Sequence, residues 1–218
     1  MNPGHSDGKD PKALARALVD RHGETYAQQA GIRLRDAPSP LYQLLVLSVL
    51  LSARISSDIA VTAARELFRA GYRSARAMRE ASWQDRVDAL GRGHYRRYDE
   101  RTATMLGKGA ELVLERWAGD LRRLHAEGRD ATGVSRLLQQ VPGIGPTGAS
   151  IFCREVQAVW PDLAPYIDER TRRGAERLGL PTDQLASLVP QADLPKLVAG
   201  CVRASLSKAV MDDLRRAA

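Results

Sequence analysis

The sequence predicts an all-α protein, and three observations support that prediction. Apolar residues recur at helical spacing through nearly the whole chain. No segment shows the strict apolar–polar alternation of a half-buried strand. Glycine, proline and capping residues separate the apolar segments, as they do at helix ends. We therefore expect a compact bundle of about ten helices.

The first half of the chain contains the most apolar of these segments. Helices are expected over residues 11–28, 41–54, 56–70, 74–81, 82–91 and 98–120. Residues 41–54, LYQLLVLSVLLSAR, are apolar on all sides, which is typical of a central buried helix. Ser56 or Ser57 is the expected N-cap of the next helix, which ends at Gly71. Ser82 is the expected N-cap of residues 82–91.

The second half begins with an expected loop or frayed insertion at residues 125–133, HAEGRDATG. Five further helices are expected, over residues 134–141, 147–160, 168–179, 182–189 and 194–216. No internal repeat or low-complexity tract interrupts the pattern. All of these segments fit one soluble helical protein.

The composition favours a nucleic acid as the partner. The 218 residues carry a net charge of +7 and give a pI of about 9.8. Only five of the 33 basic residues are lysine, so 28 are arginine. The chain starts without an apolar signal region, and its longest apolar stretch, residues 44–51, is too short to span a membrane. We therefore expect a cytoplasmic protein that has no membrane partner.

The two cysteines, Cys153 and Cys201, are too few for a disulfide framework or an iron–sulfur cluster. Each is expected to pack as a small buried hydrophobic residue. We expect no metal site and no required cofactor.

A proline–glycine turn separates two apolar helices in residues 137–152, LLQQVPGIGPTGASIF. Gly143 and Gly145 can adopt positive φ at little cost, and Ile144 can anchor the turn in the core. Pro146 suits the first turn of the second helix. Free N–H groups at that helix N-terminus would attract a phosphate. The alternative is a helix–helix turn without a ligand.

A carboxylate follows in residues 166–174, YIDERTRRG. Asp168 has a structural interpretation as a helix N-cap, and the arginines after it, Arg173 included, could form a solvated face. Near a phosphate-binding hairpin, the same carboxylate could instead stabilise positive charge on a nucleotide sugar, or activate a water, as glycosidase carboxylates do.

These segments together resemble the helix-hairpin-helix DNA glycosylases, in particular the endonuclease III-like branch. VPGIGPTGA and YIDERTRRG resemble the family's hairpin and catalytic-aspartate signature, and SPLYQLLVLSVLLSARISSD resembles its buried helix ending in Leu-Leu-Ser-Ala. YDERTATMLGKGAELVLERWAGD is a weaker match to the helix before the hairpin. The matches cover roughly residues 37–178 in the family's order.

The resemblance implies two helical lobes with a DNA-binding cleft between them. Residues 37–162 would form a six-helix lobe with the hairpin, and residues 1–36 and 163–218 the second lobe. The partner would be double-stranded DNA with a damaged or mismatched base, which is flipped out of the stack. The protein would act as a monomer and would be associated with the bacterial nucleoid. Asp168 matches the catalytic aspartate. Gly143, Ile144, Gly145 and Thr147, with Arg173, would contact DNA, and the hairpin could also hold a monovalent cation.

Three departures from the family pattern refine these implications. The four cysteines of the cluster-bearing members are missing. Thr147 stands where bifunctional members carry the lysine of the lyase reaction, which implies base removal without strand cleavage. Arg54 stands where glutamine is frequent, and it could fill the space left by the flipped base or simply lie near helix-end carbonyls.

Three functions stay open at this point. The first is a monofunctional DNA glycosylase of base excision repair that hydrolyses the N-glycosidic bond with Asp168. The second is a catalytically silent protein that binds damaged or branched DNA. The third is an enzyme that also cleaves the strand with another amine. The excised base and the pocket residues that select it are not predicted; His94, Tyr95 and Tyr98 are candidates for contact with it.

Overall fold

The computed structural model describes residues 10–216, and every regular element in that range is a helix. The expected all-α fold class is confirmed. The chain forms two compact units, which are described separately. One runs from Tyr26 to Tyr166, and the other combines the residues up to Thr25 with those from Ile167 onward. We call them the central unit and the terminal unit.

The central unit begins at Tyr26, whereas the expected lobe begins at residue 37, and it ends at Tyr166 instead of residue 162. Residues 26–36 belong to it for a clear reason. The buried carboxylate of Glu155 accepts hydrogen bonds from the backbone N–H groups of Tyr26 and Ala27, at 3.2 and 2.9 Å. Residues 1–9 of the expected second lobe lie outside the described residues.

The central unit carries nine α-helices within residues 26–166; eight of them lie within residues 37–162, for which the resemblance implied six. They are α2 (Tyr26–Gln29), α3 (Pro38–Leu51), α4 (Ser57–Arg69), α5 (Ala75–Glu80), α6 (Trp83–Arg92), α7 (Asp99–Trp117), α8 (Leu121–Gly128), α9 (Ala131–Leu138) and α10 (Pro146–Val156), followed by the 3₁₀ turn η1 (Pro161–Leu163). Capping by Ser56 and Ser82 is confirmed, because each hydroxyl accepts a hydrogen bond from the third residue after it.

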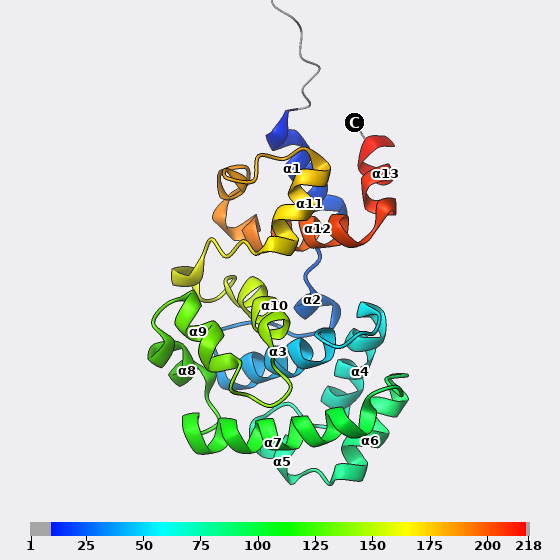
Figure 1. The fold of residues 1–218 in the computed structure, drawn as a ribbon, viewed down its shortest axis with the longest axis vertical. Helices are drawn as coiled ribbons and strands as arrows, with labels where there is room; N and C mark the ends of the chain where they lie inside the picture. The colour runs from blue at the N-terminus through cyan, green and yellow to red at the C-terminus, as the bar shows by residue number, and fades with distance from the viewer. Residues whose placement is uncertain (1–9, 217–218) are drawn as a thin grey trace, which may run out of the picture. The chain divides into compact units, whose positions relative to one another are not determined.

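The centre of this unit is α3, as expected from its continuous apolar sequence. It packs against α4, α8 and α10 (Figure 1), and every residue from Pro40 to Leu50 except Gln43 is buried. The buried hydroxyl of Ser48 donates to the carbonyl of Leu44 at 2.8 Å, so this polar group is satisfied inside the helix.

The prediction of a loop at residues 125–133 is wrong. Residues up to Gly128 extend α8, and Asp130 caps α9 by accepting a 2.7 Å hydrogen bond from the Gly133 N–H. The glycines allow two helices to approach closely. A Cβ on Gly133 would lie 2.0 Å from the carbonyl oxygen of Gly128.

The terminal unit contains α1 (Pro11–His22), α11 (Glu169–Leu178), the 3₁₀ turns η2 (Leu185–Ser187) and η3 (Gln191–Asp193), α12 (Leu194–Leu206) and α13 (Lys208–Arg216). Three expectations need correction here. The helix expected over residues 11–28 stops at its C-cap, Gly23. Residues 182–189 form only η2. The single helix expected over residues 194–216 is interrupted at Ser207, which separates α12 from α13. The unit is built on the tight contact of α11 with α12, where a Cβ on Gly174 would lie 1.8 Å from the Cys201 carbonyl oxygen.

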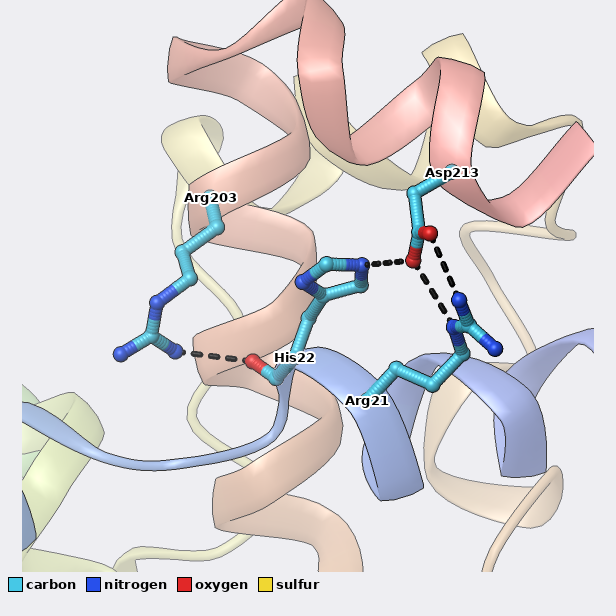
Figure 2. Close-up of polar contacts among 4 residues, drawn as sticks. All are labelled: Arg21, His22, Arg203 and Asp213. Atoms are coloured by element: carbon cyan, nitrogen blue, oxygen red, sulfur yellow. Dashed lines mark hydrogen bonds and ion pairs between the residues drawn. The ribbon is translucent and has the colours of Figure 1, made fainter.

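Polar contacts join α13, the last helix, to α1, the first (Figure 2). The Arg21 guanidinium donates two hydrogen bonds to the Asp213 carboxylate, at 2.8 and 2.6 Å, and His22 Nε2 lies 2.9 Å from the same group. Arg203 donates to the His22 carbonyl at 2.8 Å. Hydrogen bonds from Arg21 and then from His22 hold the pKa of Asp213 well below its usual range.

Candidate nucleic-acid interface

The predicted hairpin is present, formed by α9, a short turn and α10. The turn is closed by backbone hydrogen bonds from Val141 N–H to the Leu138 carbonyl and from Ile144 N–H to the Val141 carbonyl, both at 2.9 Å. Pro146 occupies the first turn of α10, as expected. The sequence therefore determines this turn locally, through its glycines and prolines.

The two hairpin glycines have different reasons to be glycine. Gly143 has φ +92°, and a Cβ there would lie 3.1 Å from Cγ1 of Val49. Gly145 has an extended backbone with φ −98°, so the expectation of positive φ applies to Gly143 alone. A Cβ on Gly145 would meet no atom within 4 Å, which leaves the space beside it open to a ligand.

Ile144 anchors the turn, as expected. Its side chain is 4% exposed, and a Cβ on Gly148 would lie 3.2 Å from its Cδ1. The side chain of Ile144 thus points into the core. Any contact with DNA at this residue would have to come from its backbone.

The N-terminus of α10 is open to an anion. Its N-cap, Gly145, supplies no side-chain hydrogen bond to the first turn, and the side chain of Thr147 is exposed. The first N–H groups of a helix have no partner within the helix and carry the positive end of its dipole. This end of α10 therefore has the properties expected of a phosphate-binding hairpin.

A cavity of about 480 Å³ joins the hairpin to the other predicted motif. The last turn of α3 contributes Val49, and the residues directly after it contribute Ser52, Ala53 and the exposed Arg54. The hairpin contributes residues 143–145. Two motifs about 90 residues apart in the sequence thus line one concave site within the central unit. Arg54 lines the same cavity as the hairpin, and its role at the DNA stays a prediction.

Sequence reasoning missed Arg101 and Met105, which line the same cavity from α7. Arg101 is exposed and, with Arg54, is the second arginine in the lining of this cavity. The weak resemblance of α7 to the family's helix before the hairpin was the available signal, but it indicated no particular side chain. Only the packing of α7 against its neighbours reveals these two residues.

The three aromatic candidates from the sequence do not all line the cavity. Tyr95 and Tyr98 line the cavity, whereas His94 is exposed and does not line it. Tyr95 is buried, its hydroxyl lies 3.4 Å from Oγ1 of Thr102, and burial raises its pKa. Tyr98 is half-buried and lies below the Arg97 guanidinium, which is 5.2 Å from its ring centroid.

Asp168 is the N-cap of α11 in the terminal unit. Its Oδ1 accepts hydrogen bonds from the Thr171 N–H at 2.9 Å and from the buried Thr171 hydroxyl at 2.7 Å. The structural interpretation of this residue is therefore correct, and it fixes the orientation of the carboxylate. Arg173, on the same helix, forms a 2.8 Å exposed ion pair with Glu169, and its contact with DNA stays a prediction.

Comparisons with solved structures place this arrangement among known folds. A non-covalent endonuclease III–DNA complex is 17% identical, with a TM-score of 0.50, and a trapped endonuclease III–DNA covalent intermediate is 16% identical, with the same score. Each match covers 88% of this chain and 84% of the other. A thermostable thymine-DNA glycosylase is 15% identical, with a TM-score of 0.53 over 88% and 86%. The chain has the fold of these enzymes. No protein-family profile and no curated protein sequence matches it.

An iron–sulfur cluster does not fit this version of the endonuclease III fold. The cysteines are Cys153 in α10 of the central unit and Cys201 in α12 of the terminal unit, and four thiolates would be needed. Burial raises the pKa of the Cys201 thiol to about 12, which disfavours the thiolate that a metal requires. Residues 10–216 contain no cluster of three metal-binding side chains. A monovalent cation at the hairpin stays a prediction.

Within the same range, no helix has both the length and the apolar character needed to cross a lipid bilayer.

Proposed function

We propose that the chain is a monofunctional DNA glycosylase that removes a damaged or mismatched base from duplex DNA. The observation that carries this proposal is the cavity that Arg54 and the hairpin both line, in a chain with the endonuclease III fold. The net charge of +7 supports DNA as the partner.

The hairpin binds a DNA phosphate through the N-terminus of α10. The open space beside Gly145 lets the phosphate approach the first N–H groups of the helix. This contact positions the duplex without reading its sequence. Arg54 then fills the space that the flipped base leaves in the stack, and the flipped base is held for reaction.

Asp168 carries the chemistry in this proposal. Its carboxylate stabilises the positive charge that develops on the sugar, and it accepts a proton from the attacking water. The water oxygen bonds to C1′ while the C1′–N bond breaks, and the electron pair leaves with the base, which then takes up a proton. The strand stays intact, because the hydroxyl of Thr147 cannot form the Schiff base that strand cleavage by elimination requires.

One observation favours a second candidate, a glycosylase-like protein that binds damaged or branched DNA without chemistry. Asp168 has a structural task as the N-cap of α11, which would explain its presence without any reaction. The third function, strand cleavage by another amine, would need a lysine outside the hairpin or an N-terminal amine. Lys12, Lys108, Lys196 and Lys208 are the lysines within the described residues, and Lys9 lies outside them.

The test uses a panel of duplexes, each with one damaged or mismatched base. A glycosylase should produce strand breaks on one or more of them only after alkali or heat, and borohydride should trap no protein–DNA adduct. Breaks on none would support the silent DNA-binding protein instead. Efficient trapping would support strand cleavage by another amine.

A Thr147→Lys variant sharpens this test, because position 147 is exposed and tolerates a long side chain. If Thr147 occupies the place of the lyase lysine, the variant should gain a borohydride-trapped adduct on the substrate that the unmodified protein processes. A variant that excises the base without any adduct would show that position 147 does not reach the sugar.

A further inference from the structure

A second cavity in the central unit, of about 630 Å³, has more arginine in its lining than any other residue type. Its walls are the segment between α2 and α3, the first turns of α3, and the end of α4 with the residues after it. Five arginines line it: Arg33, Arg35, Arg65, Arg69 and Arg73. No aspartate or glutamate is among its lining residues. We call it the arginine cavity.

The arginine cavity lies at the opposite end of α3 from the hairpin. Ser39 and Gln43, in the first half of α3, line the arginine cavity, whereas Val49 and Ser52 line the hairpin cavity. With 14 residues, α3 is about 20 Å long at about 1.5 Å per residue. The arginine cavity is therefore separate from the proposed contact between the hairpin and DNA.

Most of this positive charge is not neutralised. Arg69 is paired with Glu66, and Nε of Arg73 donates to the Phe68 carbonyl at 2.8 Å. The side chains of Arg33, Arg35 and Arg65 form no hydrogen bond or ion pair with any residue between 10 and 216. An arrangement of like charges without counter-charges is unfavourable, and a bound anion would relieve it.

The walls of the cavity are joined by hydrogen bonds. The Ser39 hydroxyl, at the start of α3, donates to the Arg73 carbonyl at 2.9 Å. Nε2 of Gln43 in turn lies 3.1 Å from the Ser39 hydroxyl oxygen and donates to it. The segment after α4 is thereby held against α3. Buried Phe68 and Pro40 supply an apolar part of the lining.

We propose that the arginine cavity binds a compact phosphate ligand with several charges, of the size of a diphosphate or triphosphate. Planar guanidinium groups form paired hydrogen bonds with phosphate oxygens, and several of them together can hold several oxygens. The volume lies within the range of about 300–1,000 Å³ that is usual for small-molecule sites. A concave site of this size suits a compact anion better than an extended strand.

Inorganic pyrophosphate is the probe that tests this proposal, by titration calorimetry on the full chain. The variant pair Arg33→Gln with Arg65→Gln removes two unpaired charges from the cavity. The control pair Arg76→Gln with Arg79→Gln removes two exposed charges from α5, outside the cavity. The cavity variant should bind pyrophosphate at least about tenfold more weakly, and the control should stay within about twofold of the unmodified protein. Absence of binding to the unmodified protein, or equal losses in both variants, would overturn the proposal.

The same variants separate this ligand from DNA. Their affinities for an undamaged duplex should be equal, because the hairpin lies elsewhere on the central unit. A selective loss of duplex affinity in the cavity variant, with pyrophosphate binding intact, would mean that a DNA strand occupies the site, and it would overturn the proposal. Neither experiment depends on base excision, so failure of the proposed function would leave this result unaffected.

Discussion

Replacing Gly143 by alanine should destabilise the central unit, whereas Gly145, the other glycine of the hairpin, should tolerate a side chain. At φ +92°, an alanine is strained by about 1–2 kcal/mol. Its Cβ would also lie 3.1 Å from Cγ1 of Val49 and 3.4 Å from Cβ of Met105, and overpacking of this kind costs about 1–3 kcal/mol. The two effects together give a loss of about 2–5 kcal/mol.

Thermal unfolding followed by circular dichroism measures this loss. For a chain of this size, about 2–4 °C is lost per kcal/mol, so the midpoint should fall by roughly 4–20 °C. Gly71→Ala is the matched control, because Gly71 has φ +97° but a Cβ added there would meet no atom within 4 Å. It should show the backbone strain alone. If Gly143→Ala lowers the midpoint no more than Gly71→Ala does, the tight packing of the turn on Val49 is refuted.

Gly145→Ser completes the comparison. The extended backbone at Gly145 suits a serine N-cap, whose hydroxyl can accept a hydrogen bond from the first turn of α10. Stability should therefore stay equal or rise. Duplex affinity should fall, because the hydroxyl occupies N–H groups and space that the phosphate needs. Unchanged duplex affinity in this folded variant would contradict phosphate binding at the hairpin.

Three further predictions concern Arg54, the effect of salt and the ion pairs of Asp213. Arg54→Ala should slow base excision more than it weakens binding to undamaged duplex, and equal losses would indicate an ordinary phosphate contact instead. Duplex affinity should fall steeply between about 50 and 200 mM salt, as expected for several phosphate contacts, and a flat salt dependence would argue against the basic surface as the binding site. Because the pKa of Asp213 is lowered in the folded protein, its carboxylate should stabilise the fold above about pH 4 and lose that effect as the pH falls further. The midpoint difference between the unmodified protein and Asp213→Asn should therefore shrink in acid, and a difference independent of pH would contradict the ion pairs of α13.

The sequence predicted those parts of the fold that depend on local interactions. The caps at Ser56 and Ser82 and the start of α10 at Pro146 each involve a side chain and the backbone beside it. The prediction of a loop at residues 125–133 was wrong, because glycines indicate flexibility when they are considered alone. In the structure, Gly128 and Gly133 instead allow α8 and α9 to pack closely, a contact that no local pattern reveals.

The candidate site, like the fold, was predictable from the sequence only where it depends on local motifs. The hairpin turn and Arg54 were found from their motifs, and the structure brings them to one cavity. Arg101 was not found, because only the packing of α7 places it there. The arginine cavity was missed for the same reason. Its arginines are spread over residues 33–73, and three separate elements must fold together before they share a surface.

The most direct test of the central claim is single-turnover base excision by Asp168→Asn, on whichever duplex the unmodified protein processes. Asparagine keeps the shape and capping ability of Asp168 but removes its charge. Asp130→Asn is the matched control, since Asp130 caps α9 in the same way through the Gly133 N–H. We expect excision to fall about 100-fold or more in Asp168→Asn, with lesion binding and thermal stability retained, and to change little in Asp130→Asn. Near-normal excision by a folded Asp168→Asn protein would contradict the assignment of the catalytic carboxylate.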